Sequence, residues 1–207
     1  MSRDLPELPD DAFMKVDPSD DALFYEPARL VTHIDESASA ALMQFYASLL
    51  PRDGAVLDLM SSWVSHLPYD LTLSEVVGHG MNEKELAANP RLDRWFVQNL
   101  NDDVTLPLAD ESFDAVLCCV GVQYLQEPVG VFGEVRRVLR PGGVVAVSFS
   151  NRCFPTKAIA VWRALDASGH AALVRLYLER AGFDGVEASV LCDGSAGDPL
   201  ICVVGRK

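Results

Sequence analysis

The sequence is poor in basic residues, with 17 Lys and Arg against 30 Asp and Glu, and its formal net charge is −13. A protein that binds nucleic acid needs a basic face to meet the phosphate backbone. No basic patch interrupts the acidity here, because Arg136, Arg137 and Arg140 are expected to decorate one helix. We therefore expect no nucleic-acid partner, whereas a small-molecule partner is compatible with this charge.

Long apolar runs and pairable cysteines are missing as well. No apolar stretch approaches the roughly 18–20 residues that a membrane-spanning helix requires, so no membrane partner is expected. The five cysteines are odd in number, and the adjacent Cys118 and Cys119 alternate onto opposite faces of a strand. No His-Cys-Cys metal spacing is present. Together with an acidic N-terminus unlike a secretory signal, this predicts reduced thiols, no metal and a cytoplasmic location.

Glycine is absent from residues 58–68, and this is the most informative gap. A strand-like run from Ala55 ends at Asp58, and further strands and helices follow at the spacing of a nucleotide-binding sheet. Such a sheet carries a glycine-rich loop after its first strand. The order of strands and helices therefore predicts a cofactor-dependent enzyme, although the loop most diagnostic of such an enzyme lacks its glycines.

Two parts are expected along the chain: an acidic arm over residues 1–24, without a sustained period, and a single domain over residues 25–207. Asp35 is expected to cap a helix that ends before Pro51. Alternating strands and helices then predict a mostly parallel sheet covered on both faces. The expected strands lie at 55–58, 75–77, 94–98, 113–119, 144–149, 186–191 and 200–204. The later helices are expected at 82–88, 128–139, 155–167 and 170–181.

Three segments together resemble the class I S-adenosylmethionine-dependent methyltransferases: AVLDL at 55–59, LPLADESFDAV at 106–116 and VLRPGGVVAV at 138–147. The resemblance covers about residues 36–207. It implies an α/β, Rossmann-like class I methyltransferase fold, with a mostly parallel seven-stranded sheet, an antiparallel C-terminal strand and helices on both faces. It also implies S-adenosylmethionine as the cofactor, bound at the carboxyl ends of the strands.

Carried over position by position, the resemblance assigns the cofactor to residues after the first three strands: Asp58, Met60, Ser61, Ser62, Gly80, Met81, Asn82, Asn99 and Leu100. Three departures stand out. Met60, Ser62 and Val64 occupy the glycine positions of the loop, where side chains take up ligand volume and resist positive φ. Gly80 stands where the ribose-binding acid belongs, with Asn82 nearby as an uncharged substitute. Asn99 replaces the aspartate that accepts from the adenine amino group.

Structural roles compete with these assignments. Asp58 could instead form a turn or a helix N-cap, and Ser61 and Ser62 could cap a following helix and present its N–H groups to the ligand. His66 and His79 are candidates for a base, although a lone histidine is more often packed or solvated.

The catalytic candidates are His79, Tyr124 and Asn151, and the substrate-binding candidates are Tyr25, His33, Gln123, Tyr124, Asn151 and Arg152. The arm and the segment before Asp35 are expected to fold over the pocket as a lid. The alternatives are a packed Tyr124 and a surface Arg152. The leading hypothesis is S-adenosylmethionine-dependent methyl transfer to a small-molecule acceptor. The rival hypothesis is a non-catalytic protein of the same fold that binds a nucleoside, a metabolite or a protein partner.

Overall fold

The computed structural model describes residues 5–207, which are built around one seven-stranded sheet with the order β3-β2-β1-β4-β5-β7-β6. Neighbouring strands from β3 to β5 pair in parallel, and β7 is antiparallel to both β5 and β6. This confirms the expected mostly parallel sheet with an antiparallel C-terminal strand. The strands are β1 (Ala55–Leu59), β2 (Glu75–Gly80), β3 (Arg94–Val97), β4 (Phe113–Cys119), β5 (Leu139–Phe149), β6 (Asp184–Cys192) and β7 (Leu200–Arg206).

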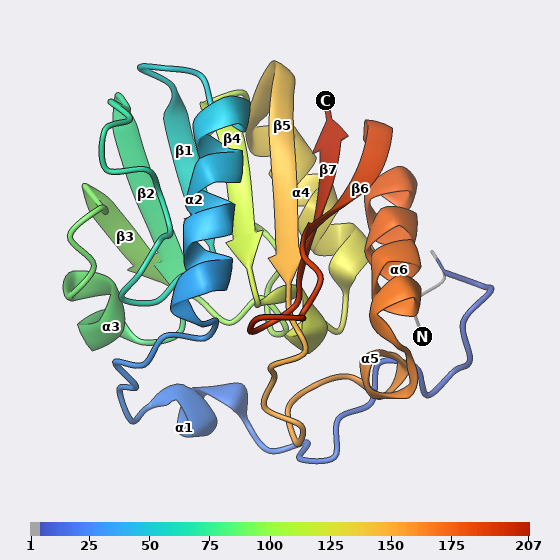
Figure 1. Ribbon diagram of the computed structural model, residues 1–207. Helices are drawn as coiled ribbons and strands as arrows, with labels where there is room; N and C mark the ends of the chain where they lie inside the picture. The colour runs from blue at the N-terminus through green and yellow to red at the C-terminus, as the bar shows by residue number, and fades with distance from the viewer. Residues whose placement is uncertain (1–4) are drawn as a thin grey trace.

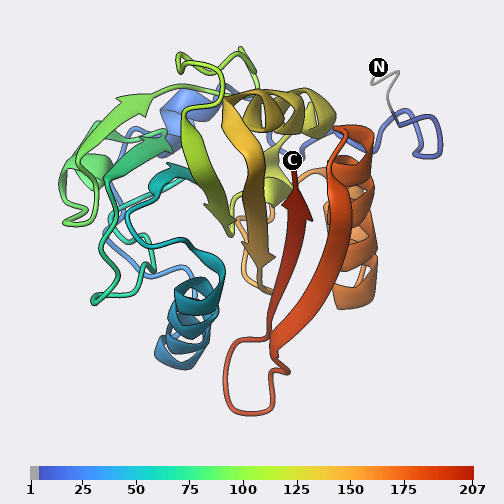
Figure 2. The same ribbon diagram turned by 90° about the horizontal axis from the view of Figure 1, so that it is seen from above.

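Helices cover both faces of this sheet, as expected. In Figures 1 and 2, α2 (Glu36–Leu49) lies on one face, and α4 (Pro128–Val138) and α6 (Ala167–Arg180) lie on the other. Four short helices complete the fold: α1 (Asp21–Tyr25), α3 (Glu83–Ala87), the 3₁₀ helix η1 (Val122–Tyr124) and α5 (Ala160–Ala164). Within residues 5–207 no helix is long and apolar enough to cross a membrane.

The buried strands supply one hydrophobic core to each face, because successive side chains of a strand point to opposite sides. Val56 joins the core beneath α2 with Leu42, whereas Leu57 joins the core beneath α4 and α6 with Val135 and Leu178. A parallel sheet packed on both faces needs such continuously apolar strands. All five residues of β1 are accordingly buried.

Two helix starts occur where short polar side chains predicted them. Asp35 accepts a hydrogen bond from the Ala38 N–H at 2.8 Å, and Asn82 accepts from the N–H groups of residues 84 and 85. The helix expected over 155–167 is wrong in extent. Only α5 forms there, and α6 already begins at Ala167 because Asp166 caps it by accepting from the Gly169 N–H at 2.8 Å.

The described part of the arm is ordered and packed, unlike the aperiodic segment that its composition suggested. Leu5 and Ala12 are buried, Lys15 forms an isolated β-bridge with Ile159, and α1 follows. Residues 1–4 lie outside the described part of the chain. In Figure 1 the arm passes below the ends of β4 and β5 to which their arrowheads point.

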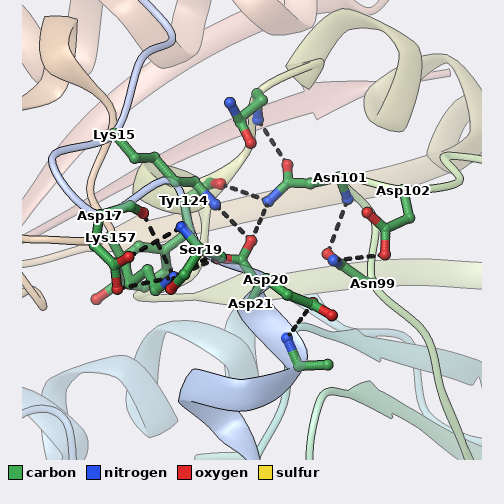
Figure 3. A network of polar contacts seen from close by, with 12 residues as sticks. Lys15, Asp17, Ser19, Asp20, Asp21, Asn99, Asn101, Asp102, Tyr124 and Lys157 are labelled. Atoms are coloured by element: carbon green, nitrogen blue, oxygen red, sulfur yellow. Dashed lines mark hydrogen bonds and ion pairs between the residues drawn. The ribbon is translucent and has the colours of Figure 1, made fainter.

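A buried network of charges holds the arm in place (Figure 3). The side chain of Lys157 is fully buried, and its Nζ lies 2.8 Å from the Ser19 carbonyl oxygen and 3.1 Å from Asp17 Oδ2. Lys15 pairs with Asp21 at 2.5 Å, and the Asn101 amide donates to the same Asp21 oxygen at 2.9 Å. The network therefore joins the arm to the segment after β3 and to the loop before α5.

Replacing Lys157 with methionine is expected to loosen the arm, because the buried Asp21 would lose one of its two cationic partners. We expect Lys157→Met to lower the free energy of unfolding by about 3 kcal/mol and to speed amide exchange over residues 15–25. The control Arg175→Met removes an exposed pair with Glu179 and should cost only about 0.5 kcal/mol. Equal effects of the two substitutions in urea unfolding would contradict the proposed clamp.

Candidate functional site

A cavity lies at the carboxyl ends of β1, β2 and β4, where the strand order reverses between β1 and β4. Open α/β sheets bind ligands at such a reversal. The nine positions assigned to a cofactor by resemblance all line this one cavity: Asp58, Met60, Ser61, Ser62, Gly80, Met81, Asn82, Asn99 and Leu100. Tyr25, His33, His79 and Tyr124 line it too. The structure thus gathers these candidates at one place.

Three of the substrate candidates do not line the cavity, which corrects the expectation that they face it. Gln123 is buried and donates to the Val120 carbonyl at 2.9 Å. Asn151 is exposed, and Arg152 pairs with Asp198 at 2.7 Å on the surface. Asn151 and Arg152 lie in the polar loop after β5, from which Phe154 reaches the cavity instead.

The loop after β1 crosses to β2 without forming a helix, so Ser61 and Ser62 cap nothing. Met60 adopts φ +58°, the left-handed conformation that a glycine would take without strain. The Ser61 N–H then donates to the His79 carbonyl at 2.6 Å, which continues the pairing of β1 with β2. The glycine-free loop therefore keeps the turn of a glycine loop but lacks the helix N-terminus that would present N–H groups to an anion.

Gly80 is required for space rather than for an unusual backbone conformation. A Cβ atom at this position would fall well inside contact distance of the Ser61 carbonyl oxygen and would also press on Leu86. No acidic side chain fits here while the loop lies in this position. The missing ribose acid is thus a geometric consequence of the loop that passes over the end of β2.

Asp58 is a buried carboxylate, and no cation pairs with it within the described residues. Burial raises its pKa from an ordinary 3.8 to about 6, while the hydroxyls of Ser61 and Ser65 oppose that rise. Ser61 Oγ donates to Asp58 Oδ2 at 2.6 Å. At neutral pH this group is a largely ionised carboxylate at the cavity wall and attracts a cationic ligand.

Glu85 is a second acid of the wall, and sequence reasoning missed it. It is buried on α3, where one carboxylate oxygen accepts from Ser62 Oγ at 2.6 Å and the other from the Arg29 N–H at 2.6 Å. No ion pair involves Glu85 within residues 5–207. Its one sequence signal was an acid in the first turn of a helix directly after the second strand.

The two asparagines near the cavity use their amides for structure. Asn82 caps α3 through its oxygen, and its amide nitrogen donates to the carbonyls of Tyr25 and Glu26. Asn99 closes a local turn, since it accepts from the Asn101 N–H and donates to Asp102. The idea that Asn82 substitutes for a ribose acid is therefore corrected, because its amide hydrogens hold the C-terminal end of α1 instead.

His79 is buried with both ring nitrogens engaged, which leaves no lone pair for a base. Its Nδ1 lies 3.1 Å from the Met60 N–H donor, and its Nε2 lies 3.0 Å from the Gln98 carbonyl oxygen. Burial lowers the pKa of His79 to about 4, so it is neutral. Its role in this geometry is to bridge the loop after β1 to the end of β3, which corrects the catalytic assignment.

Aromatic rings close the cavity on the side of the arm. Phe154 contacts the rings of Phe24, Tyr25, His33 and Tyr124 at centroid distances between 5.2 and 6.5 Å. The Tyr124 hydroxyl accepts from the Phe154 N–H at 2.8 Å, and burial raises the pKa of Tyr124 to about 12. Tyr124 is therefore a neutral, structurally engaged phenol, and the rings form an apolar wall.

Residues 54–147 match the family described as a methyltransferase domain. The match begins just before β1, ends within β5 and covers less than half of the chain. A solved S-adenosylmethionine-dependent methyltransferase from Mesorhizobium loti has the same fold, with a TM-score of 0.57, 18% identity and coverage of 81% of this chain and 98% of that one.

Curated relatives match this chain over shorter spans. A malonyl-[acyl-carrier protein] O-methyltransferase from Marinomonas sp. is 33% identical over 91 residues, which is 44% of this chain and 33% of that protein. A biotin biosynthesis bifunctional protein from Teredinibacter turnerae is 35% identical over 72 residues, which is 35% of this chain and 13% of that protein. The chain thus spans a third or less of the length of these two relatives.

Gly80→Ala tests the contact that excludes the family's ribose acid. The added methyl group meets the Ser61 carbonyl, so we expect a loss of about 1–3 kcal/mol in the free energy of unfolding. In the control Gly133→Ala, the added Cβ has no neighbour within 4 Å in α4, and helix propensity should add up to about 1 kcal/mol. If Gly80→Ala were as stable as the wild type in urea unfolding, the loop could move away from residue 80 at no cost, and the proposed steric exclusion would be wrong.

Asp58→Asn tests whether the buried carboxylate is held at a cost to stability. The unfolded aspartate ionises near pH 3.8 and the folded one near pH 6, so wild-type stability falls as the pH rises between these values and then levels off. We expect Asp58→Asn to gain roughly 3 kcal/mol relative to the wild type between pH 4 and pH 8. Asp70→Asn, an exposed change on the same crossing segment, should show no such gain. A pH-independent difference between Asp58→Asn and the wild type would refute the raised pKa.

Proposed function

We propose that this chain transfers a methyl group from S-adenosylmethionine to a small-molecule acceptor in the cytoplasm. The observation that carries the proposal is the unpaired Asp58 carboxylate in a cavity at the strand reversal of a methyltransferase-family sheet. A cofactor with an ammonium and a sulfonium group meets complementary charge there. The five free cysteines support a reducing compartment, and the net charge of −13 argues against a nucleic-acid acceptor.

The residues of the cavity fit the cofactor, but the ribose hydroxyls would be held from a different position than the resemblance assigns. Asp58 would hold the cationic amino end, and Glu85 would take over the ribose hydroxyls that Gly80 cannot bind. Each Glu85 oxygen accepts one hydrogen bond in the structure, and a carboxylate oxygen accepts two. Bound S-adenosylmethionine supplies an electrophilic methyl group that needs no metal, and the described residues form no cluster of three or more metal-binding side chains.

The chain's own contribution would be to position the acceptor and to exclude water. Holding two reactants in line accounts for much of the rate of a group transfer. The arm, clamped by Lys157, and the ring of Phe154 cover the cavity from the side of α1. Strained backbone at Met60 and Val120, with φ of +58° and +47°, lies in the cavity wall, which is where functional sites store strain.

A second candidate function is the binding of a nucleoside or metabolite without transfer. The contact of Ser61 with Gly80 favours it, because this contact leaves no room at residue 80 for the ribose acid that the resemblance assigns there. The two functions differ in one respect that can be measured, namely turnover of an acceptor once the cofactor is bound.

Titration calorimetry with S-adenosylhomocysteine tests the proposal and the role of Glu85. We expect micromolar binding by the wild type, with Glu85→Gln about tenfold weaker, which corresponds to about 1.4 kcal/mol. Glu83→Gln, an exposed acid of the same helix, is the control and should bind like the wild type.

The 2′-deoxy analogue of the ligand locates the interaction. Removal of the hydroxyl should weaken binding to the wild type but not further weaken binding to Glu85→Gln. No binding to the wild type at millimolar ligand would overturn the proposed function. Additive losses from the two changes would overturn only the role of Glu85.

A further inference from the structure

Aromatic rings form the part of the cavity wall that the proposed cofactor does not engage. Four of them line it: Phe154, Tyr25, His33 and Tyr124. The rings of Tyr25 and His33 stand at 74° and 85° to that of Phe154, whereas the ring of Tyr124 is stacked on it at 27°. Rings at such angles can pack against a flat aromatic ligand through both their faces and their edges.

His33 is the basic group of this wall. Its ring nitrogens have no hydrogen-bond partner among residues 5–207, and its side chain is only partly buried, so water can reach it. Burial lowers the pKa of His33 below the ordinary 6.5, although the nearby Glu85 opposes that shift. At neutral pH the imidazole is therefore uncharged, and one ring nitrogen has a lone pair available for a proton.

The other basic groups of the cavity are engaged or less suited to take a proton. His79 has both ring nitrogens in hydrogen bonds. His66 is buried, its Nδ1 lies 2.8 Å from Ser39 Oγ, and its pKa is lowered to about 4 by burial and by the neighbouring His33. Of the three acids, two are assigned to the cofactor and Asp21 pairs with lysines of the arm and of the loop before α5. His33 is thus left as the base that faces an acceptor.

A base of lowered pKa suits an oxygen acceptor and not an alkylamine. While a hydroxyl oxygen forms its bond to the methyl carbon, its O–H becomes far more acidic than an imidazolium, so the proton can move to the imidazole in the same step. A methylated alkylammonium instead holds its proton with a pKa of about 10, near that of a lysine, and a neutral imidazole does not remove it.

We propose that the acceptor is a flat aromatic hydroxyl compound, a phenol, and that His33 takes its proton. This inference rests on the proposed methyl transfer. The phenol oxygen forms the new O–C bond and displaces the sulfur, which keeps the electron pair of the broken S–C bond. The electrons of the O–H bond stay on oxygen, and the proton passes to a ring nitrogen of His33 and then to water. The products are an aryl methyl ether, S-adenosylhomocysteine and one proton.

Matched probes that differ only in the hydroxyl hydrogen test the contact with His33: phenol and anisole, and 2-naphthol and 2-methoxynaphthalene. Calorimetry on protein saturated with S-adenosylhomocysteine should show each phenol binding at least tenfold tighter than its ether, because only the phenol donates a hydrogen bond. In His33→Phe this preference should fall below twofold. Wild-type protein that binds the ethers as tightly as the phenols would overturn the inference.

Turnover separates proton transfer from mere positioning. His33→Gln keeps a hydrogen-bond acceptor but cannot take the proton, so kcat for 2-naphthol should fall at least 100-fold while KM changes less than threefold. The control His170→Gln makes the same change at a partly buried histidine of α6 outside the cavity lining, and it should leave both constants unchanged. An unaltered kcat in a folded His33→Gln protein would overturn the role of His33. If the His33 variants do not fold, the wild-type phenol and ether pairs decide.

The inference and the proposed function fail in different ways. If S-adenosylhomocysteine binds and no phenol binds at millimolar concentration, only the acceptor class is wrong. If S-adenosylhomocysteine itself does not bind, the proposed function fails, and the assignment of a phenol acceptor fails with it.

Discussion

The hydrogen bond from the Ser61 N–H to the His79 carbonyl, at 2.6 Å, is the constraint on which the rest of the site depends. It extends the pairing of β1 with β2 by one step and brings the loop down over Gly80. From that position follow the left-handed Met60, the exclusion of a side chain at residue 80, and the His79 ring that holds the Met60 N–H. The path of this loop leaves no room at residue 80 for the ribose acid that the resemblance assigns there.

The same loop orients the two acids that the proposed function assigns to the cofactor. Ser61 holds the Asp58 carboxylate and Ser62 holds that of Glu85, so the two serines in glycine-loop positions orient the two buried acids. Glu85 also accepts from the Arg29 N–H, and the Asn82 amide donates to the carbonyls of Tyr25 and Glu26, which ties the end of α1 and the residues after it to the site. Burying carboxylates without cations lowers stability, and natural proteins retain such groups where a ligand completes the charge. In the proposed function, the cationic amino end of the cofactor supplies the charge that the buried Asp58 lacks in the fold.

Local and periodic features were predictable from the sequence, whereas long-range contacts were not. Apolar runs predicted the strands, short polar side chains predicted the caps at Asp35 and Asn82, and resemblance placed nine residues that share one cavity. The roles of Glu85, Phe154 and Lys157 depend on partners between 23 and 140 residues away, with no local signature. Asn151 and Arg152 were assigned to the substrate because polarity in a loop does not reveal that an aromatic neighbour turns inward.

The central claim is that the rearranged loop and Glu85 accommodate S-adenosylmethionine in the cavity at the strand reversal. A crystal structure of the chain with S-adenosylhomocysteine tests it most directly. The account predicts the ligand in this cavity, with its amino group on Asp58, its ribose hydroxyls on Glu85, and the Ser61 carbonyl still packed over Gly80. A ligand bound elsewhere, or one that enters only with the loop lifted from Gly80 and with Glu85 unengaged, would contradict it.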